Sequence, residues 1–135
     1  MTKWAKSLIR ISTHEVEMVQ KRVAEIAARR WAVEAQIAAL DLEVAEEAAR
    51  TAESAEFGIY LIGFREGAKQ RREALVAKAA EIEAEETGAR DALAEAFETL
   101  KKYEHVAQAA KVAAAKEESR RETAALDELG LRKRS

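Results

Sequence analysis

The chain has no proline and no cysteine, and only five glycines and seven aromatic residues among 135. Without proline, no position is barred from a helix interior. Without cysteine, the chain forms no disulfide and has no thiol chemistry, which fits a cytosolic protein. His14 and His105 are the only histidines, and they show no paired ligand spacing. The sequence therefore predicts no metal site.

Long apolar runs and a strong excess of one charge are also absent. The longest apolar run, Ile59 to Ile62, is far too short to span a bilayer, and the N-terminus lacks the apolar stretch of a signal peptide. The formal net charge of -2 argues against a dedicated nucleic-acid binder. No glycine pattern matches a phosphate-binding loop. We therefore expect no enzyme, no cofactor, no nucleic-acid partner and no direct membrane insertion.

What remains is rich in alanine and charge, as in a long-helix or coiled-coil protein. Apolar residues in the first part of the chain are spaced alternately by three and four residues over five heptads, which is the pattern of a coiled-coil seam. The first series comprises Ile9, Val16, Val23, Arg30, Ile37 and Val44, and the second comprises Ser12, Val19, Ile26, Val33 and Leu40.

A second, weaker pair of series has the same phase. It comprises Leu75, Ile82, Ala89, Ala96, Tyr103 and Ala110, together with Ala79, Glu86, Leu93, Leu100, Ala107 and Ala114. Between the two arms, the segment Phe57 to Gly67 holds three of the five glycines, each of which costs a helix about 1 kcal/mol relative to alanine. This segment predicts a break at which the arms fold back on each other.

The predicted fold class is all-α, with two long helices in an antiparallel coiled-coil hairpin. We expect a single domain over residues 1–135, with helices at about 3–54 and 65–129, a tip turn at about 55–66 and a frayed tail at 130–135. Folding about residue 61 would place Leu40 opposite Ile82. Arg30, a charged residue at a seam position, is expected to set the register. In an alternative fold, Gly88 splits the second arm and gives a three-helix bundle.

Three segments resemble the flagellar export protein FliJ family. They are SLIRISTHEVE (7–17), AFETLKKYE (96–104) and ALDELGLRKRS (125–135). The resemblance implies a monomeric, non-enzymatic adaptor, similar in fold to the central stalk of rotary ATPases. It implies three partners in flagellar type III export: the hexameric export ATPase, the membrane export gate and export chaperones. The implied location is cytoplasmic, at the membrane periphery.

Two groups of residues are candidates for these contacts. At the tip, apolar side chains exceed what a turn requires, and the resemblance assigns them to the export gate: Phe57, Tyr60, Leu61 and Phe64. At the terminal end, a mixed charged and apolar group is assigned to the ATPase: Trp4, Lys6, Leu8, Arg10, Arg120 and Arg121. The alternatives are a generic coiled-coil scaffold or the stalk subunit of another rotary ATPase.

Overall fold

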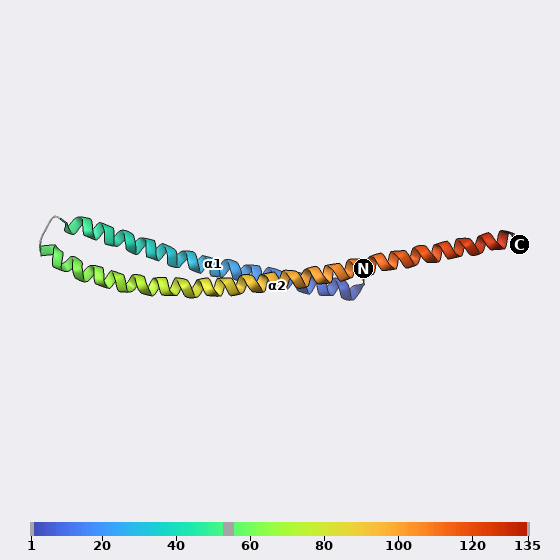
Figure 1. Ribbon diagram of the computed structural model, residues 1–135, viewed down its shortest axis with the longest axis horizontal. Helices are drawn as coiled ribbons and strands as arrows, with labels where there is room; N and C mark the ends of the chain where they lie inside the picture. Colours follow the sequence, from blue (N-terminus) through green and yellow to red (C-terminus); the bar gives the residue numbers. More distant parts are fainter. Residues whose placement is uncertain (1, 53–55, 135) are drawn as a thin grey trace. The chain divides into compact units, whose positions relative to one another are not determined.

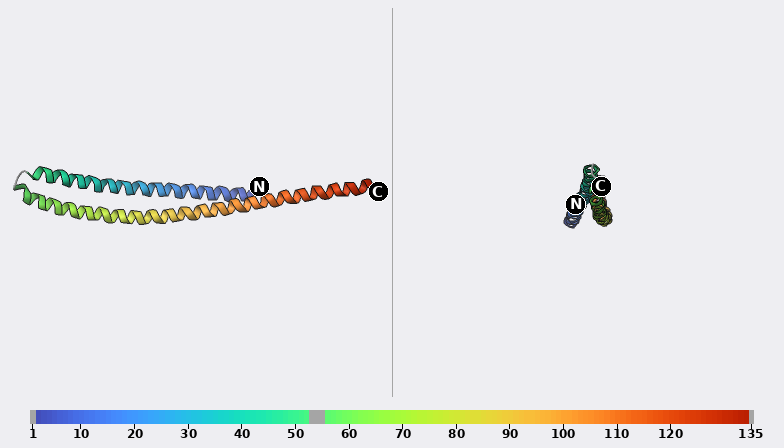
Figure 2. Two further views of the ribbon diagram at one scale, coloured as in Figure 1. Left: turned by 45° about the horizontal axis from the view of Figure 1, so that its top comes forward. Right: turned by 90° about the vertical axis from the view of Figure 1, so that its left-hand side faces the viewer.

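The structure is a computed structural model that describes residues 2–52 and 56–134. The described residues form two α-helices, α1 (Lys3–Thr51) and α2 (Glu56–Arg134), and no strand. Each helix contributes to two compact units, one made of Met1–Met18 with Leu93–Ser135 and the other of Val19–Ala92. In each unit the two helical segments run antiparallel and side by side (Figure 1; Figure 2). The predicted fold class is confirmed. The prediction of a single domain stays a prediction.

The heptad seam is confirmed along both helices. All eleven predicted positions of α1 are buried or half-buried, and so are the predicted positions of α2 up to Ala107. Ala110 and Ala114, which continue the same series, are exposed. The residues between seam positions are mostly polar and exposed, as expected for paired amphipathic helices.

The core of the Val19–Ala92 unit packs branched aliphatic side chains of α1 against both large and small side chains of α2. Ile26, Val33, Ile82 and Ala89 form its buried cluster, with exposed fractions of 2–4%. Its half-buried border consists of Val23, Ile37, Leu75 and Ala79. A fully buried large aliphatic side chain stabilises the fold by about 1.5–3 kcal/mol. The cluster therefore contributes several kcal/mol at most to the free energy of helix pairing, on the order of its few large side chains.

The predicted tip turn at about 55–66 is wrong. Residues 56–66 form the first three turns of α2. Residues 53–55, which include the predicted end of the first helix, lie outside the described chain. Gly63 has no positive φ, and a Cβ added there would meet no atom within 4 Å. The helix tolerates its glycines because Leu61, Phe64 and Ala68 continue the seam and are at least half-buried. Their packing offsets the cost of glycine in a helix.

Two further boundaries differ from the predictions. The helix α2 continues through Gly88, so the alternative three-helix bundle is wrong. It also continues through Gly130 to Arg134, so the predicted frayed tail is wrong for residues 130–134. Gly130 is not in the left-handed conformation that commonly ends a helix.

The register differs from the prediction by about one heptad. The predicted register would put Asp41 opposite Glu81, whereas Asp41 binds Arg72 at 2.9 Å. Arg29 likewise contacts Glu85 at 3.0 Å. The cause is the position of the turn: because α2 begins at Glu56, the fold-back point lies several residues before Leu61.

A charged layer interrupts the apolar seam of this unit. The Arg30 Nε donates to Glu86 Oε2 at 2.6 Å, and Arg90 donates to Glu86 Oε1 at 2.8 Å. Arg30 also donates to Glu34. Glu86 is only 6% exposed, and both its carboxylate oxygens accept hydrogen bonds. These bonds, that of Arg30 foremost, lower the pKa of Glu86 below its usual 4.5. A slipped register would separate Glu86 from Arg30, its partner on the other helix, and leave two charges near the seam without each other.

Replacing Gly63 by alanine distinguishes a helix from a turn at this position. We expect Gly63→Ala to raise the free energy of unfolding by about 1 kcal/mol, because the helix there has room for a Cβ. Urea unfolding followed by circular dichroism measures the change. Gly88→Ala, in the middle of the same helix, is the matched control and should give a gain of similar size. Destabilisation by Gly63→Ala alone would show that the chain turns there.

The lowered pKa of Glu86 makes the stability of the helix pair depend on pH. The ionised carboxylate is favoured in the folded chain, so its contribution is complete above about pH 4.5 and is lost as the pH falls through the folded-state pKa. Urea midpoints of the wild type and of Glu86→Gln, measured between about pH 3 and pH 7, should therefore converge in acid. Glu81→Gln, at an exposed position, should show no such convergence. A wild-type advantage over Glu86→Gln that grows in acid would contradict this assignment.

Candidate protein-binding surfaces

The start of α2 presents an exposed apolar surface in the Val19–Ala92 unit. We call Phe57, Ile59, Tyr60 and Ile62 the turn-end surface. Their exposed fractions are 53%, 81%, 55% and 71%. Phe57 and Tyr60 are left uncovered because α1 has ended at Thr51, whereas Ile59 and Ile62 lie off the seam, on the side of α2 that faces away from α1. Exposed apolar side chains at this density are typical of a contact site for another protein.

The four residues predicted for the export gate contact divide into two pairs. Phe57 and Tyr60 are exposed, whereas Leu61 and Phe64 are half-buried on the seam side of α2. Tyr60 and Phe64 stack with ring centroids 6.2 Å apart, as expected for aromatic residues four positions apart on a helix. Phe64 therefore supports Tyr60 from the seam, and Phe57 and Tyr60 remain accessible to a partner.

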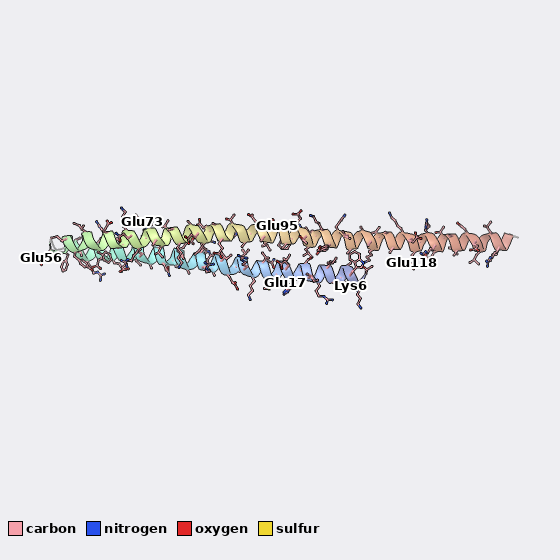
Figure 3. The ribbon with its side chains drawn as sticks, turned by 90° about the horizontal axis from the view of Figure 1, so that it is seen from below. Lys6, Glu17, Glu56, Glu73, Glu95 and Glu118 are labelled. Carbon is pink, nitrogen blue, oxygen red and sulfur yellow. The ribbon has the colours of Figure 1, made fainter. Side chains whose placement is uncertain are left out.

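A shallow groove adjoins the turn-end surface. It is lined by Glu47, Arg50, Thr51, Glu56, Phe57 and Tyr60. Its polar wall is ordered by local contacts, because Arg50 pairs with Glu47 at 2.6 Å and the Thr51 hydroxyl donates to the Glu47 carbonyl at 2.8 Å. Figure 3 labels Glu56 at the start of α2. The groove thus offers apolar contact beside fixed charges.

The residues predicted for the ATPase contact lie in the other unit and do not form one cluster. Trp4, Lys6 and Arg10 are exposed on the first turns of α1, and Leu8 is half-buried. Within this unit, the first buried residue of α1 is Ala5 and the last of α2 is Ala107. Beyond it α2 runs to Arg134, roughly 40 Å, with its side chains almost entirely exposed (Figure 3, near Glu118).

Arg120 and Arg121 lie on this extended part of α2. Both contact Glu117, at 2.9 Å and 3.6 Å. They lie thirteen and fourteen residues beyond Ala107, or about 20 Å along the helix. They are thus separate from the basic residues of α1 in the same unit. The sequence placed them together because it predicted where the chain folds back several residues too late.

Several exposed apolar residues were missed as site candidates. Ile59 is 81% exposed, more than Phe57 or Tyr60 among the predicted tip residues, and Ile11 and Met18 are 67% and 50% exposed. The sequence alone could have identified them, because each is a large apolar residue that lies off the seam positions of the heptad pattern. A large aliphatic residue off the seam of a two-stranded coiled coil has no partner helix to bury it.

The described residues hold no group of three or more acidic or histidine side chains that could bind a metal ion. Of the helices described, none has a stretch long and apolar enough to cross a membrane. The features that the described residues do offer are exposed apolar and charged helix faces.

Two antiparallel helices joined by one heptad seam define an α-helical coiled-coil protein. Two curated sequences, each called flagellar FliJ protein and each from a strain of Caulobacter vibrioides, are 53% identical to the chain over 133 residues. The alignments cover 98% of this chain and 96% of each relative. The chain belongs to the FliJ family of flagellar proteins, and the resemblance seen in the sequence is confirmed. No family profile and no solved structure matches it.

Proposed function

We propose that the chain is a non-enzymatic adaptor of the bacterial flagellar type III export apparatus. In this role it connects the hexameric export ATPase to the membrane export gate and receives export chaperones. The observation that carries the proposal is the 53% identity to flagellar FliJ proteins over nearly the whole chain. The exposed helix faces supply surfaces for such contacts, and none resembles a catalytic cleft.

The turn-end surface is the proposed contact for the export gate. Its accessible aromatic residues, Phe57 and Tyr60, are of the type that dominates binding energy at protein interfaces. The adjoining groove places the Arg50–Glu47 ion pair at the rim, as in interfaces with an apolar centre and a polar border. Ile59 and Ile62 extend the apolar area around the helix.

The proposed ATPase contact uses the basic residues in the unit of the two termini. Lys6 and Arg10 on α1 and Arg120 and Arg121 on α2 are exposed, and the extended part of α2 leaves a full helical surface available. The geometry favours two separate contacts, one on α1 and one on the extended part of α2, rather than one cluster. Export chaperones are proposed to bind elsewhere on the helices. The protein acts as a cytoplasmic monomer that associates with the membrane through the apparatus.

The gate contact is tested by truncating its two accessible aromatic residues. Phe57→Ala with Tyr60→Ala should weaken binding to the purified cytoplasmic domain of the export gate by about tenfold or more, because an interface aromatic residue commonly contributes over 1 kcal/mol. Isothermal titration measures the affinity and circular dichroism the helix content. Trp31→Ala, which removes an aromatic residue that is 66% exposed elsewhere, is the matched control. Unchanged affinity of the double variant would exclude this surface.

The ATPase contact is tested by reversing charge on the extended part of α2. Arg120→Glu with Arg121→Glu should weaken binding to the export ATPase, and wild-type binding should fall as salt rises from about 0.05 to 0.5 M, because exposed charges are then screened. Surface plasmon resonance at several salt concentrations measures both effects. Lys78→Glu with Lys69→Glu, reversing two exposed lysines in the other unit, controls for net charge. An affinity for the ATPase that changes with neither salt concentration nor charge reversal would contradict the proposal.

A further inference from the structure

A second apolar stripe runs along α1 in the unit of Met1–Met18 and Leu93–Ser135. It comprises Trp4, Leu8, Ile11 and Met18, with Glu15 at the remaining position, so the spacing alternates between four and three residues. Trp4, Ile11 and Met18 are 53%, 67% and 50% exposed. The stripe lies one residue before the buried seam positions Ala5, Ser12 and Val16. It therefore widens the apolar face of α1 beyond what α2 covers.

On the neighbouring helix, a partly apolar stripe of seam and off-seam residues faces the same side. Ala96 and Tyr103 are half-buried seam residues of α2, and Thr99 and Val106 lie beside the seam, with Val106 47% exposed. The two stripes face a common groove, lined by Leu8, Ile11, Ser12, Glu15, Ala96, Thr99 and Tyr103. The buried seam residue Ser12 lies in its floor. The groove is thus continuous with the established interface between the two helices.

The other side of the same helix pair is mainly polar. Lys6 and Thr13 on α1 and Glu104 and Lys111 on α2 lie on the far side of the seam by helical spacing, and all four are exposed. Phe97, 37% exposed, is the one large apolar residue at the equivalent positions of α2. Helix pairing alone requires no such asymmetry, because both flanks of a two-stranded seam face solvent. An apolar flank on one side indicates a third helical neighbour.

Glu15 is the one charged side chain in this groove, and it has no ion pair or hydrogen bond within the described chain. By contrast, most charges near the seam of the other unit are paired. A carboxylate among apolar side chains is stabilised most by a charge-assisted hydrogen bond to a cationic side chain of the bound protein. The groove therefore favours an occupant that is apolar on one face and basic at one point.

The size of the surface distinguishes a single helix from a second copy of the chain. From Trp4 to Met18 the stripe is about 21 Å long, which a helix of about 15 residues covers. Two copies packed face to face over this length and two helix widths would bury roughly 400 Å² each, well below the roughly 800 Å² per partner of a stable interface. A single helix lying between the two stripes contacts both and covers the apolar area of the groove.

We propose that this groove binds one amphipathic helix of another protein, with a lysine or arginine of that helix facing Glu15. The bound segment completes a local three-helix bundle and carries apolar residues at three- and four-residue spacing. The contact is small and therefore reversible. The proposal does not depend on the flagellar role, because it follows from the two stripes, the groove and Glu15 alone.

The test uses the full chain with Trp31→Phe, which leaves Trp4 as its only tryptophan. Two synthetic amphipathic peptides of about 18 residues, a length that spans the stripe, differ only in one central residue, lysine or glutamate. We expect a saturable blue shift of Trp4 emission, with the lysine peptide bound roughly three- to tenfold more tightly. Glu15→Lys should reverse that preference. Equal affinities of both peptides for the two proteins, or no shift, would overturn the proposal.

Matched variants locate the binding. Ile11→Ser should weaken binding of the lysine peptide by about tenfold or more, because it removes a large apolar contact. Leu42→Ser, at a residue 60% exposed on α1 in the other unit, should leave binding unchanged. Circular dichroism checks that both remain helical. Two results would assign the groove otherwise and overturn the proposal: a dimer in sedimentation that Ile11→Ser abolishes, or a Trp4 shift with anionic lipid vesicles but not with peptide.

Discussion

The burial of one heptad seam against another is the constraint on which the structure depends. Among the described residues, burial is concentrated at the seam positions of both helices, so the two helices pair along this narrow stripe. Alanine at many seam positions of α2 lets large side chains of α1, such as Ile26 and Val33, pack closely against it. The seam leaves all other faces open, and the candidate binding surfaces lie where large apolar residues occupy those faces.

A seam of this kind does not by itself choose its register, because a shift by one heptad again places apolar residues opposite apolar residues. The charged layer removes that freedom. Glu86 is held by Arg30 and Arg90 at hydrogen-bonding distance, and a shift in register would leave a buried charge without its cross-helix partner. The charged layer therefore fixes the alignment of the two helices, whereas apolar packing alone would allow more than one alignment. This division of roles is familiar from polar residues in other coiled coils.

The candidate surfaces follow from the same geometry. The turn-end surface is exposed because α1 ends at Thr51 while α2 begins with apolar residues. The groove in the other unit is open because the α1 stripe that borders it lies beside the seam rather than on it. The chain belongs to a family of flagellar proteins, and the proposed contacts assign partners to faces that helix pairing leaves uncovered. Each proposed contact uses apolar or charged residues that the helix pairing leaves exposed.

The sequence by itself determined the helical class, the seam positions and the family, because heptad spacing and local similarity are one-dimensional signals. It could have shown the register too, since Arg30 and Glu86 are the charged residues of the two predicted seams and belong opposite each other. Only the tertiary structure decided where the chain turns. Local propensity predicted the break at the glycines near Gly63, but burial of Leu61, Phe64 and Ala68 at seam positions offsets the cost of glycine in a helix. That balance depends on contacts between residues far apart in sequence, and it decided which apolar side chains are buried and which are left for partners.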